Sequence, residues 1–298
     1  VQAADGTRLI AKFYRPDRWS RAAILQEHEF IRACAAGEVP VVAPLPLAGG
    51  GTLGDVDGIP FAVFPKRAGR QFEITADGDW RRLGGIIARI HLAGARGTAP
   101  ARLRLHPQAS TVRFVDELLA AEVMPADQSR VFQTVCTDLL DRFTDRFTDL
   151  EEIRVHGDLH LGNLLHRPGE GLMVIDFDDM MTGPPVHDLW LLLPDHAPRA
   201  QREIDLLLAG YEQFREFDRT TLELIEPLRA MRLIYFLAWC ARQRHDRGFR
   251  RHFPDWGTRA YWAGEIRDLE EQAERARAAL APRTMIPQYY SARQLTED

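Results

Sequence analysis

Two short segments in the middle of the chain constrain its fold most, because each places a carboxylate just after an apolar stretch. The first reads HGDLHLGN at residues 156–163, and the second reads VIDFD at residues 174–178. A Pro- and Gly-containing turn at residues 167–171 separates them, so we predict two short strands within residues 153–178. The polar side chains of both segments are then expected to meet at one end of this unit.

Asp158, Asn163 and Asp176 supply the groups that phosphoryl transfer requires. A carboxylate orients the attacking hydroxyl and accepts its proton, while an amide oxygen and a second carboxylate hold magnesium. We therefore predict Asp158 as catalytic and Asn163 and Asp176 as metal ligands. Asp178 would add a ligand or an indirect contact. Carboxylates so close together repel one another, which favours a bound cation.

The spacing of these residues resembles the aminoglycoside phosphotransferase and choline kinase superfamily, whose fold is kinase-like. Protein kinases carry HRDxxxxN and then DFG, whereas here Gly157 replaces the arginine and Asp178 replaces the last glycine. Four further segments resemble the bacterial stress response kinase A subfamily of Ser/Thr protein kinases. They are residues 11–19, 61–65, 183–190 and 225–232.

The resemblance implies an α+β, two-lobe, protein-kinase-like fold of the aminoglycoside phosphotransferase type. The sheet-rich nucleotide-binding lobe would span residues 1–66 and the helical lobe residues 67–298, with ATP and magnesium between them. Lys12 would bind the α- and β-phosphates of ATP. Glu27 would pair with Lys12, because on a helix it lies nearer the inner stripe than Glu29, which we expect to face water.

Further positions follow from the same resemblance. Phe64 and Lys66 would lie in the connector beside the adenine. His156 would orient the catalytic loop. Asp188 would accept hydrogen bonds from the backbone of that loop, or would cap the helix that follows it. His156 and His160 lack the further nitrogen or sulfur donors that a zinc site needs.

Length and composition are those of an ordinary globular protein, with 298 residues, 45% of them apolar and 27% charged. The net charge of −5 argues against a nucleic-acid partner. Cys34, Cys136 and Cys240 are isolated, which favours a reducing cytoplasm. No apolar stretch approaches the roughly twenty residues that cross a bilayer. We expect a cytoplasmic monomer that does not engage membranes.

Periodicity predicts one strand at residues 8–14 and a helix from about residue 17 or 20 to residue 36, with short strands between residues 39 and 64. Helices are expected at residues 79–95, 130–145, 199–215, 221–246 and 258–280, and a loop after Pro282. The chain begins at Val1, within a predicted hairpin whose first strand is residues 1–4. We therefore expect the N-terminus, and the loop that covers the β- and γ-phosphates, to lie outside this sequence.

Two groups of side chains in the helical half have less specific interpretations. Arginines at residues 242–251 form either a solvated helix face or a docking surface for an acidic peptide or nucleic acid. Six aromatic residues are predicted to be core residues. They are Trp190, Tyr235, Phe236, Trp239, Trp256 and Trp262.

The predicted function is transfer of the γ-phosphate of ATP to Ser or Thr of a protein in a bacterial stress response, including autophosphorylation. One alternative is a small-molecule kinase with a choline-, homoserine- or aminoglycoside-like acceptor. Another is a binding module that keeps the kinase fold with weak catalysis. A tight acidic pocket would favour a cationic metabolite, and an open cleft would favour a polypeptide.

Overall fold

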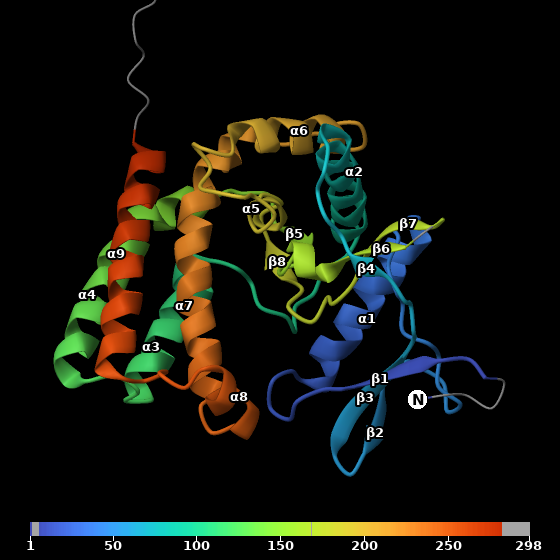
Figure 1. The fold of residues 1–298 in the computed structure, drawn as a ribbon, viewed down its shortest axis with the longest axis horizontal. Coiled ribbons are helices and arrows are strands. Elements are labelled where there is room, and N and C mark those ends of the chain that lie inside the picture. Colours follow the sequence, from blue (N-terminus) through green and yellow to red (C-terminus); the bar gives the residue numbers. More distant parts are fainter. Residues whose placement is uncertain (2–5, 168, 282–298) are drawn as a thin grey trace, which may run out of the picture.

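The computed structural model of the chain describes residues 1, 6–167 and 169–281. A small antiparallel sheet with one long helix lies at one end of the molecule, and helices form most of the remainder (Figure 1). This is the predicted α+β, two-lobe, kinase-like arrangement. The predicted loop after Pro282 and most of the predicted first strand lie outside the described residues.

The small sheet contains β1 (Leu9–Phe13), β3 (Ile59–Pro65) and β2 (Gly54–Val56), in the order β1-β3-β2. All neighbours are antiparallel, and the register sets Lys12 opposite Ala62. Asp57 and Gly58 join β2 to β3 with φ of 52° and 78°, the left-handed pair that suits a two-residue hairpin turn.

Helix α1 (Arg21–Ala36) connects the small sheet to the main core. Its first turn is capped by the Ser20 side chain, which accepts a hydrogen bond from the backbone N–H of Ala23. Ile24 near its start is buried in a small apolar cluster with Tyr14, Leu53 and Ala62 of the sheet side. The second half of the helix contributes residues 30, 31 and 34 to the large core. One helix thus holds the two lobes in a defined orientation.

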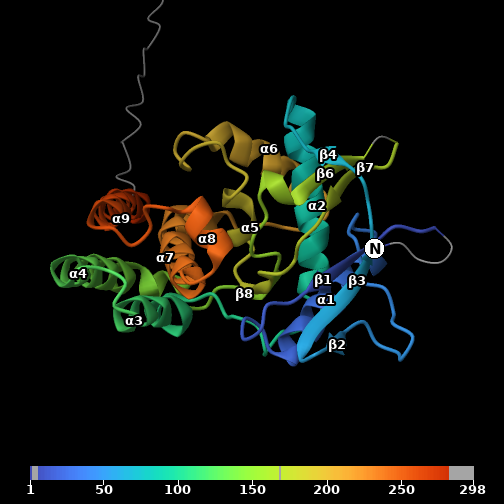
Figure 2. The ribbon, with the colours of Figure 1, turned by 60° about the horizontal axis from the view of Figure 1, so that its bottom comes forward.

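The larger lobe is built mainly from helices (Figures 1 and 2). They are α2 (Asp77–Gly94), α3 (Val112–Ala120), α4 (Ala126–Phe143), α5 (His187–Trp190), α6 (Gln201–Tyr211), α7 (Ile225–Gln243), α8 (Arg247–His252) and α9 (Arg259–Leu280). Helices α2 and α6 approach closely because Gly84 leaves no side chain between them. A Cβ atom there would lie 1.9 Å from the carbonyl oxygen of Leu207. Within the described residues, no helix combines the length and apolar character that crossing a membrane requires.

Five short strands form two small sheets at the centre of the molecule. β5 (Ile153–Val155) pairs with β8 (Met181–Gly183), and β6 (Leu164–Arg167) pairs with β7 (Gly171–Val174), while β4 (Arg70–Gln71) adds to β6. The predicted pair of strands is therefore three strands, and β8 follows them. Asp158 comes after β5 and Asp176 comes after β7.

The structure corrects several expectations about the helices. Helices α3 and α8 were not predicted, because they span nine and six residues, too few turns for a clear periodicity. Helix α4 begins at Ala126, four residues before the predicted start. Phe236 is not a core residue, because its side chain is 38% exposed. Trp190 and Trp262 are buried as predicted.

Candidate active site

The loop after β5 depends on a glycine. Gly157 has φ of +83°, and a Cβ atom at this position would lie 2.1 Å from the carbonyl oxygen of Asp179. A side chain is therefore excluded both by the left-handed backbone conformation and by the close approach of the next loop. This accounts for glycine at the position where protein kinases have arginine.

Asp188, at the start of α5, holds this loop in place. Its side chain is fully buried, and it accepts hydrogen bonds from the backbone N–H of His156 at 2.7 Å and of Gly157 at 2.9 Å. His91 of α2 lies 3.1 Å from the same carboxylate. Burial acts to raise the pKa of Asp188, but the hydrogen bond and charge of His91 outweigh it and lower the pKa to about 2. The contacts are those of a loop anchor and not of a helix cap.

His156 joins the loop after β5 to the segment after β7. Its Nε2 atom lies 3.0 Å from the carbonyl oxygen of Ile175, and the Ile175 N–H donates to the backbone oxygen of Asn163 at 3.0 Å. The Asn163 side-chain amide donates to the carbonyl oxygen of Asp158 at 2.9 Å, so its Oδ1 remains available as an acceptor. Asp176 has φ of 63° and a side chain that is 54% exposed.

Lys12 of β1 connects the small sheet to these loops. Its Nζ atom lies 3.2 Å from Glu27, 2.9 Å from Asp178 and 3.6 Å from Asp176. Burial acts to lower the pKa of Lys12, but these three carboxylates outweigh it and raise the pKa. The predicted pairing of Lys12 with Glu27 is confirmed. Asp178 contacts Lys12 more closely still, so it acts as an ion-pair partner of the lysine.

Glu27 is supported from behind by a buried chain of hydrogen-bonding groups. Tyr14 donates its hydroxyl to Glu27 at 3.3 Å and lies 2.9 Å from His28, whose other ring nitrogen lies 2.7 Å from the Thr52 hydroxyl. Burial raises the pKa of Glu27, although Lys12 opposes that rise. Burial also lowers the pKa of His28 to about 4. These hydrogen-bonding groups therefore fix the orientation of the Glu27 carboxylate, which faces Lys12.

Two arginines for which no role was predicted also belong to this site. Arg232 of α7 donates to Asp158 at 2.5 Å. Arg18 lies 2.9 Å from Asp178 and 2.7 Å from Asp179. Burial acts to lower the pKa of Arg18, but these carboxylates outweigh it and raise the pKa. The protein thus supplies its own cations among the carboxylates, so repulsion between them is no longer an argument for a metal ion. Both arginines lie in segments that resemble the family, and this resemblance is the feature of the sequence that could have identified them.

The remaining predicted positions lie further from this cluster. Phe64 packs its ring against His28 at 6.2 Å, and the backbone N–H of Lys66 donates to the carbonyl oxygen of Arg8. Neither Phe64 nor Lys66 lines the pocket at Asp158. Glu29 is exposed as predicted, but it also forms an ion pair with buried Arg154 at 3.1 Å.

A pocket of about 230 Å³ opens beside Asp158. It is lined by Arg18, Asp158, Asp176, Asp178, Asp179, Arg232, Tyr235, Phe236 and Trp239. The Tyr235 hydroxyl donates to Asp179 at 2.8 Å. Within the described part of the chain, no three His, Cys, Asp or Glu side chains are grouped so that they could hold a metal ion by themselves. A metal here would need the Asn163 amide oxygen and ligands from outside the protein.

Comparison with known proteins agrees with this geometry. The chain is 36% identical over 281 residues to "Stress response kinase A" of Escherichia coli strain K12, covering 92% of this chain and 83% of the relative. It is also 36% identical over 278 residues, with the same coverage, to "Serine/threonine protein kinase RdoA" of Salmonella typhimurium strain LT2.

A solved structure, amicoumacin kinase hAmiN in complex with AMP-PNP, Ca²⁺ and Ami, has the same fold. It covers 91% of this chain and 84% of its own at a TM-score of 0.70 and 20% identity. The model of the phosphotransferase enzyme family matches residues 1–225. The chain therefore belongs to the phosphotransferase enzyme family, with a kinase-like fold.

Proposed function

We propose that this protein transfers the γ-phosphate of ATP to Ser or Thr hydroxyls of a protein, with magnesium as the metal. The observation that carries the proposal is that Lys12 contacts Glu27 on one side and Asp176 and Asp178 on the other. A lysine in this position joins the small lobe to the loop that follows β7, where a nucleotide phosphate and its metal would meet.

The side chains present fit a magnesium ion. The Oδ1 atom of Asn163 and the exposed carboxylate of Asp176 are hard oxygen donors, and magnesium usually takes one or two such protein ligands together with phosphate oxygens and water. When bound, magnesium would neutralise charge that develops on the phosphate oxygens. Lys12 would bind the α- and β-phosphates of ATP, and Glu27 would hold Lys12 in position.

Asp158 would orient the acceptor hydroxyl and take its proton. The hydroxyl oxygen forms a bond to the γ-phosphorus, the bond from that phosphorus to the bridging oxygen breaks, and ADP leaves with that oxygen. Arg232 holds one carboxylate oxygen of Asp158 at 2.5 Å, so the other oxygen faces the acceptor. His160 lies 3.5 Å from that second oxygen.

The charge balance of the pocket supports a protein acceptor over a polycationic antibiotic. Its four carboxylates are set against the guanidinium groups of Arg18 and Arg232 and the ammonium group of Lys12. Little negative charge is left to attract an amino sugar with several ammonium groups. The names of the relatives in Escherichia coli and Salmonella point in the same direction, including to a stress response.

The second candidate is a small-molecule kinase with a compact acceptor such as an amino alcohol. The pocket volume of about 230 Å³ suits a single side chain or a metabolite of similar size. The shared fold of the amicoumacin kinase also keeps this class open.

Asp158→Asn tests the proposal. Transfer of labelled γ-phosphate to protein acceptors should fall by at least ~10²-fold, because general base assistance of this kind contributes roughly 10² to 10⁴ in rate. Binding of a fluorescent ATP analogue and the melting temperature should stay near those of the wild type. Asp141→Asn, on an exposed part of α4, is the matched control. Undiminished transfer by Asp158→Asn would reject the assignment, and wild-type transfer to amino alcohols but not to proteins would favour the second candidate.

A further inference from the structure

An aromatic surface continues from the pocket mouth to α8. Phe236 and Trp239 of α7 line the pocket beside Asp158, and their rings stack with centroids 5.8 Å apart. Phe253 lies 6.2 Å from Phe236, and Phe249 lies 6.4 Å from Trp239. Since Phe236 is 38% exposed, this surface offers an apolar contact next to the reacting groups.

Helix α8 adds positive charge at the far end of the aromatic surface. Phe249 is buried and holds the helix against α7, whereas Arg247, Arg250 and Arg251 are exposed. Arg250 donates to the backbone oxygen of His245. In the part of the chain that the structure describes, no carboxylate lies within 4 Å of any of these three guanidinium groups. Their charge is therefore available to a partner.

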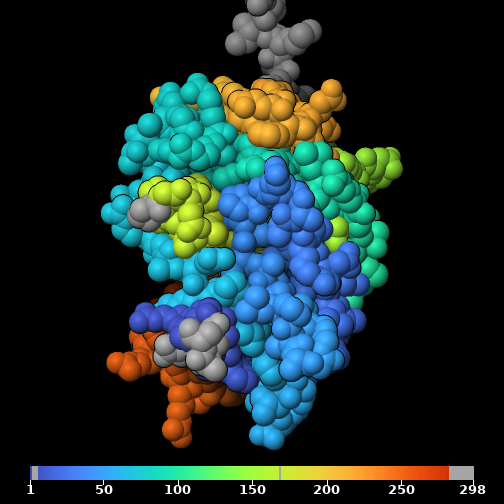
Figure 3. Space-filling model, turned by 90° about the vertical axis from the view of Figure 1, so that its right-hand side faces the viewer, coloured from blue at the N-terminus to red at the C-terminus, as the bar shows by residue number. Residues whose placement is uncertain are grey.

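The arginines of α8 stand beside the loop that borders the pocket. Arg15 forms an ion pair at 3.5 Å with Asp246, the residue that caps α8. The same loop after β1 carries Arg18, which lines the pocket. In Figures 1 and 2 this loop lies next to α8, and in Figure 3 orange residues of the α7–α8 region border the dark blue N-terminal residues. Helix α8, which carries the exposed arginines, therefore lies beside the loop and the helix that line the pocket.

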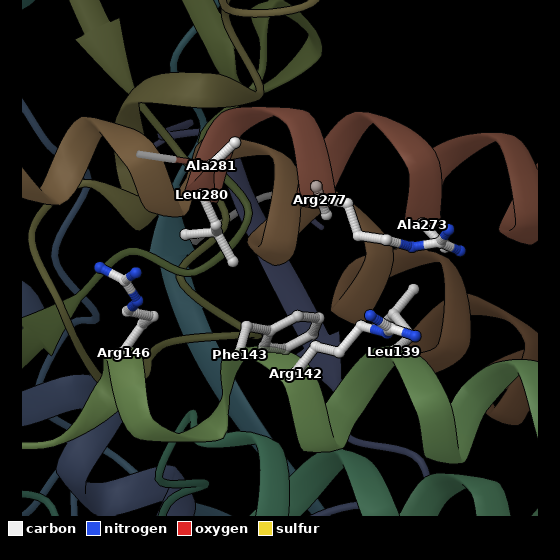
Figure 4. Close-up of a pocket in the computed structure, with 9 residues that line it drawn as sticks. Leu139, Arg142, Phe143, Arg146, Ala273, Arg277, Leu280 and Ala281 are labelled. Atoms are coloured by element: carbon white, nitrogen blue, oxygen red, sulfur yellow. The ribbon is translucent and has the colours of Figure 1, made fainter. Parts of the chain in front are cut away.

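A second arginine-rich surface differs from α8 because its arginines are paired with carboxylates. A hollow of about 220 Å³ between α4 and α9 has an apolar floor and three arginines (Figure 4). Each is paired with a carboxylate at 2.7 to 3.1 Å: Arg142 with Asp138, Arg146 with Glu223 and Arg277 with Glu274. Because these charges are neutralised within the protein, the hollow attracts acidic partners less and offers a matched control.

We propose that Phe236, Trp239, Phe253, Arg247, Arg250 and Arg251 form a docking surface for an acidic segment of the protein substrate. This inference rests on the proposed protein kinase function. A large apolar side chain next to the accepting Ser or Thr would pack on Phe236 and Trp239, because aromatic residues are enriched at protein interfaces. Asp or Glu residues further along would face the arginines of α8.

Charge favours a peptide over a nucleic acid as the occupant. The chain as a whole has a net charge of −5, which disfavours binding of a polyanionic backbone along its surface. At the pocket end the carboxylates are paired with Lys12, Arg18 and Arg232, so that end suits an uncharged hydroxyl. A peptide can combine acidic residues at one end with an apolar residue and an uncharged hydroxyl at the other. Its charge can therefore match both ends of the docking surface.

The test is direct binding of a fluorescein-labelled peptide to the full chain with magnesium and a non-hydrolysable ATP analogue. The peptide carries one serine, an adjacent phenylalanine and four glutamates to one side. The variant Arg247→Gln/Arg250→Gln/Arg251→Gln should bind it about tenfold more weakly, as expected for three rim charges together. Its affinity should also depend less on salt concentration. Arg142→Gln/Arg146→Gln/Arg277→Gln should bind like the wild type.

The aromatic part of the docking surface has its own variant. Phe236→Ala should weaken binding of the phenylalanine peptide several-fold. It should have little effect on a peptide with alanine at that position, because that peptide already lacks the contact with Phe236. Melting temperatures of both variants would show that they are folded.

The outcomes separate this inference from the proposed function. No measurable binding by the wild type, or equal binding by the α8 variant, would overturn the docking surface. Tighter binding of a twelve-nucleotide single strand, lost in the same variant, would overturn it in favour of nucleic acid. Arginine-dependent peptide binding without phosphate transfer to the bound serine would support the docking surface and count against the protein kinase function.

Discussion

Replacing Asp188 by asparagine should both destabilise the fold and slow catalysis. The carboxylate accepts two backbone hydrogen bonds from the catalytic loop while fully buried. An asparagine would present an NH₂ group to one of these N–H donors. Loss of one charge-assisted hydrogen bond and weakening of the other should cost about 2 to 4 kcal/mol in the free energy of unfolding.

The pKa of Asp188 leads to a similar figure. A pKa of about 2, against an ordinary value near 3.8, corresponds to roughly 2 kcal/mol of stabilisation of the charged form. Because the folded-state pKa is the lower one, this stabilisation is present above pH 3.8 and is lost as the pH falls towards 2. Burial lowers the pKa values of His28 and His187 to about 4, although the charge of Asp188 acts to raise that of His187. Both histidines titrate above that window.

Urea unfolding of wild type and Asp188→Asn from pH 4 to pH 8 would measure the difference, which should be nearly constant over this range. The rate of phosphate transfer should fall about tenfold to a hundredfold, since small displacements of a catalytic group have effects of that size. Asp138→Asn is the control, because its exposed pair with Arg142 should contribute less than about 1 kcal/mol. A variant with wild-type stability and rate would refute the view that Asp188 positions the loop.

Two further substitutions test the packing and the lysine pair. Gly84→Ala should unfold at a clearly lower temperature, because its Cβ would lie 1.9 Å from the carbonyl oxygen of Leu207. Gly78→Ala, in the first turn of the same helix with nothing within 4 Å of its Cβ, should be neutral or stabilising by up to about 1 kcal/mol. If both alanines lower the melting temperature equally, close helix packing is not the reason for Gly84. Glu27→Gln should raise the Kd for an ATP analogue several-fold with little change in melting temperature, because it removes the charge that orients Lys12; an unchanged Kd would contradict that role.

Local patterns in the sequence predicted much of the local arrangement of the candidate site. The spacing of Asp158, Asn163 and Asp176, each next to a strand, predicted loops that meet, and the structure brings these loops together through His156 and Ile175. The position of Glu27 on its helix predicted the pair with Lys12. Such predictions succeed because helix and strand periodicity determine which residues share a face.

The partners of the charged groups could not be found in this way. Arg232 meets Asp158 across 74 positions of the chain, and Arg18 meets Asp179 across 161. Asp178 lies 2.9 Å from Lys12, a partner that its place in the sequence did not indicate. The sequence by itself thus determined the fold class, the candidate residues for phosphoryl transfer and the local geometry that carries them. Only the tertiary structure decided which cation neutralises which carboxylate. It also decided which aromatic and basic side chains lie beside them. An ion pair depends on separations in space that no local pattern encodes.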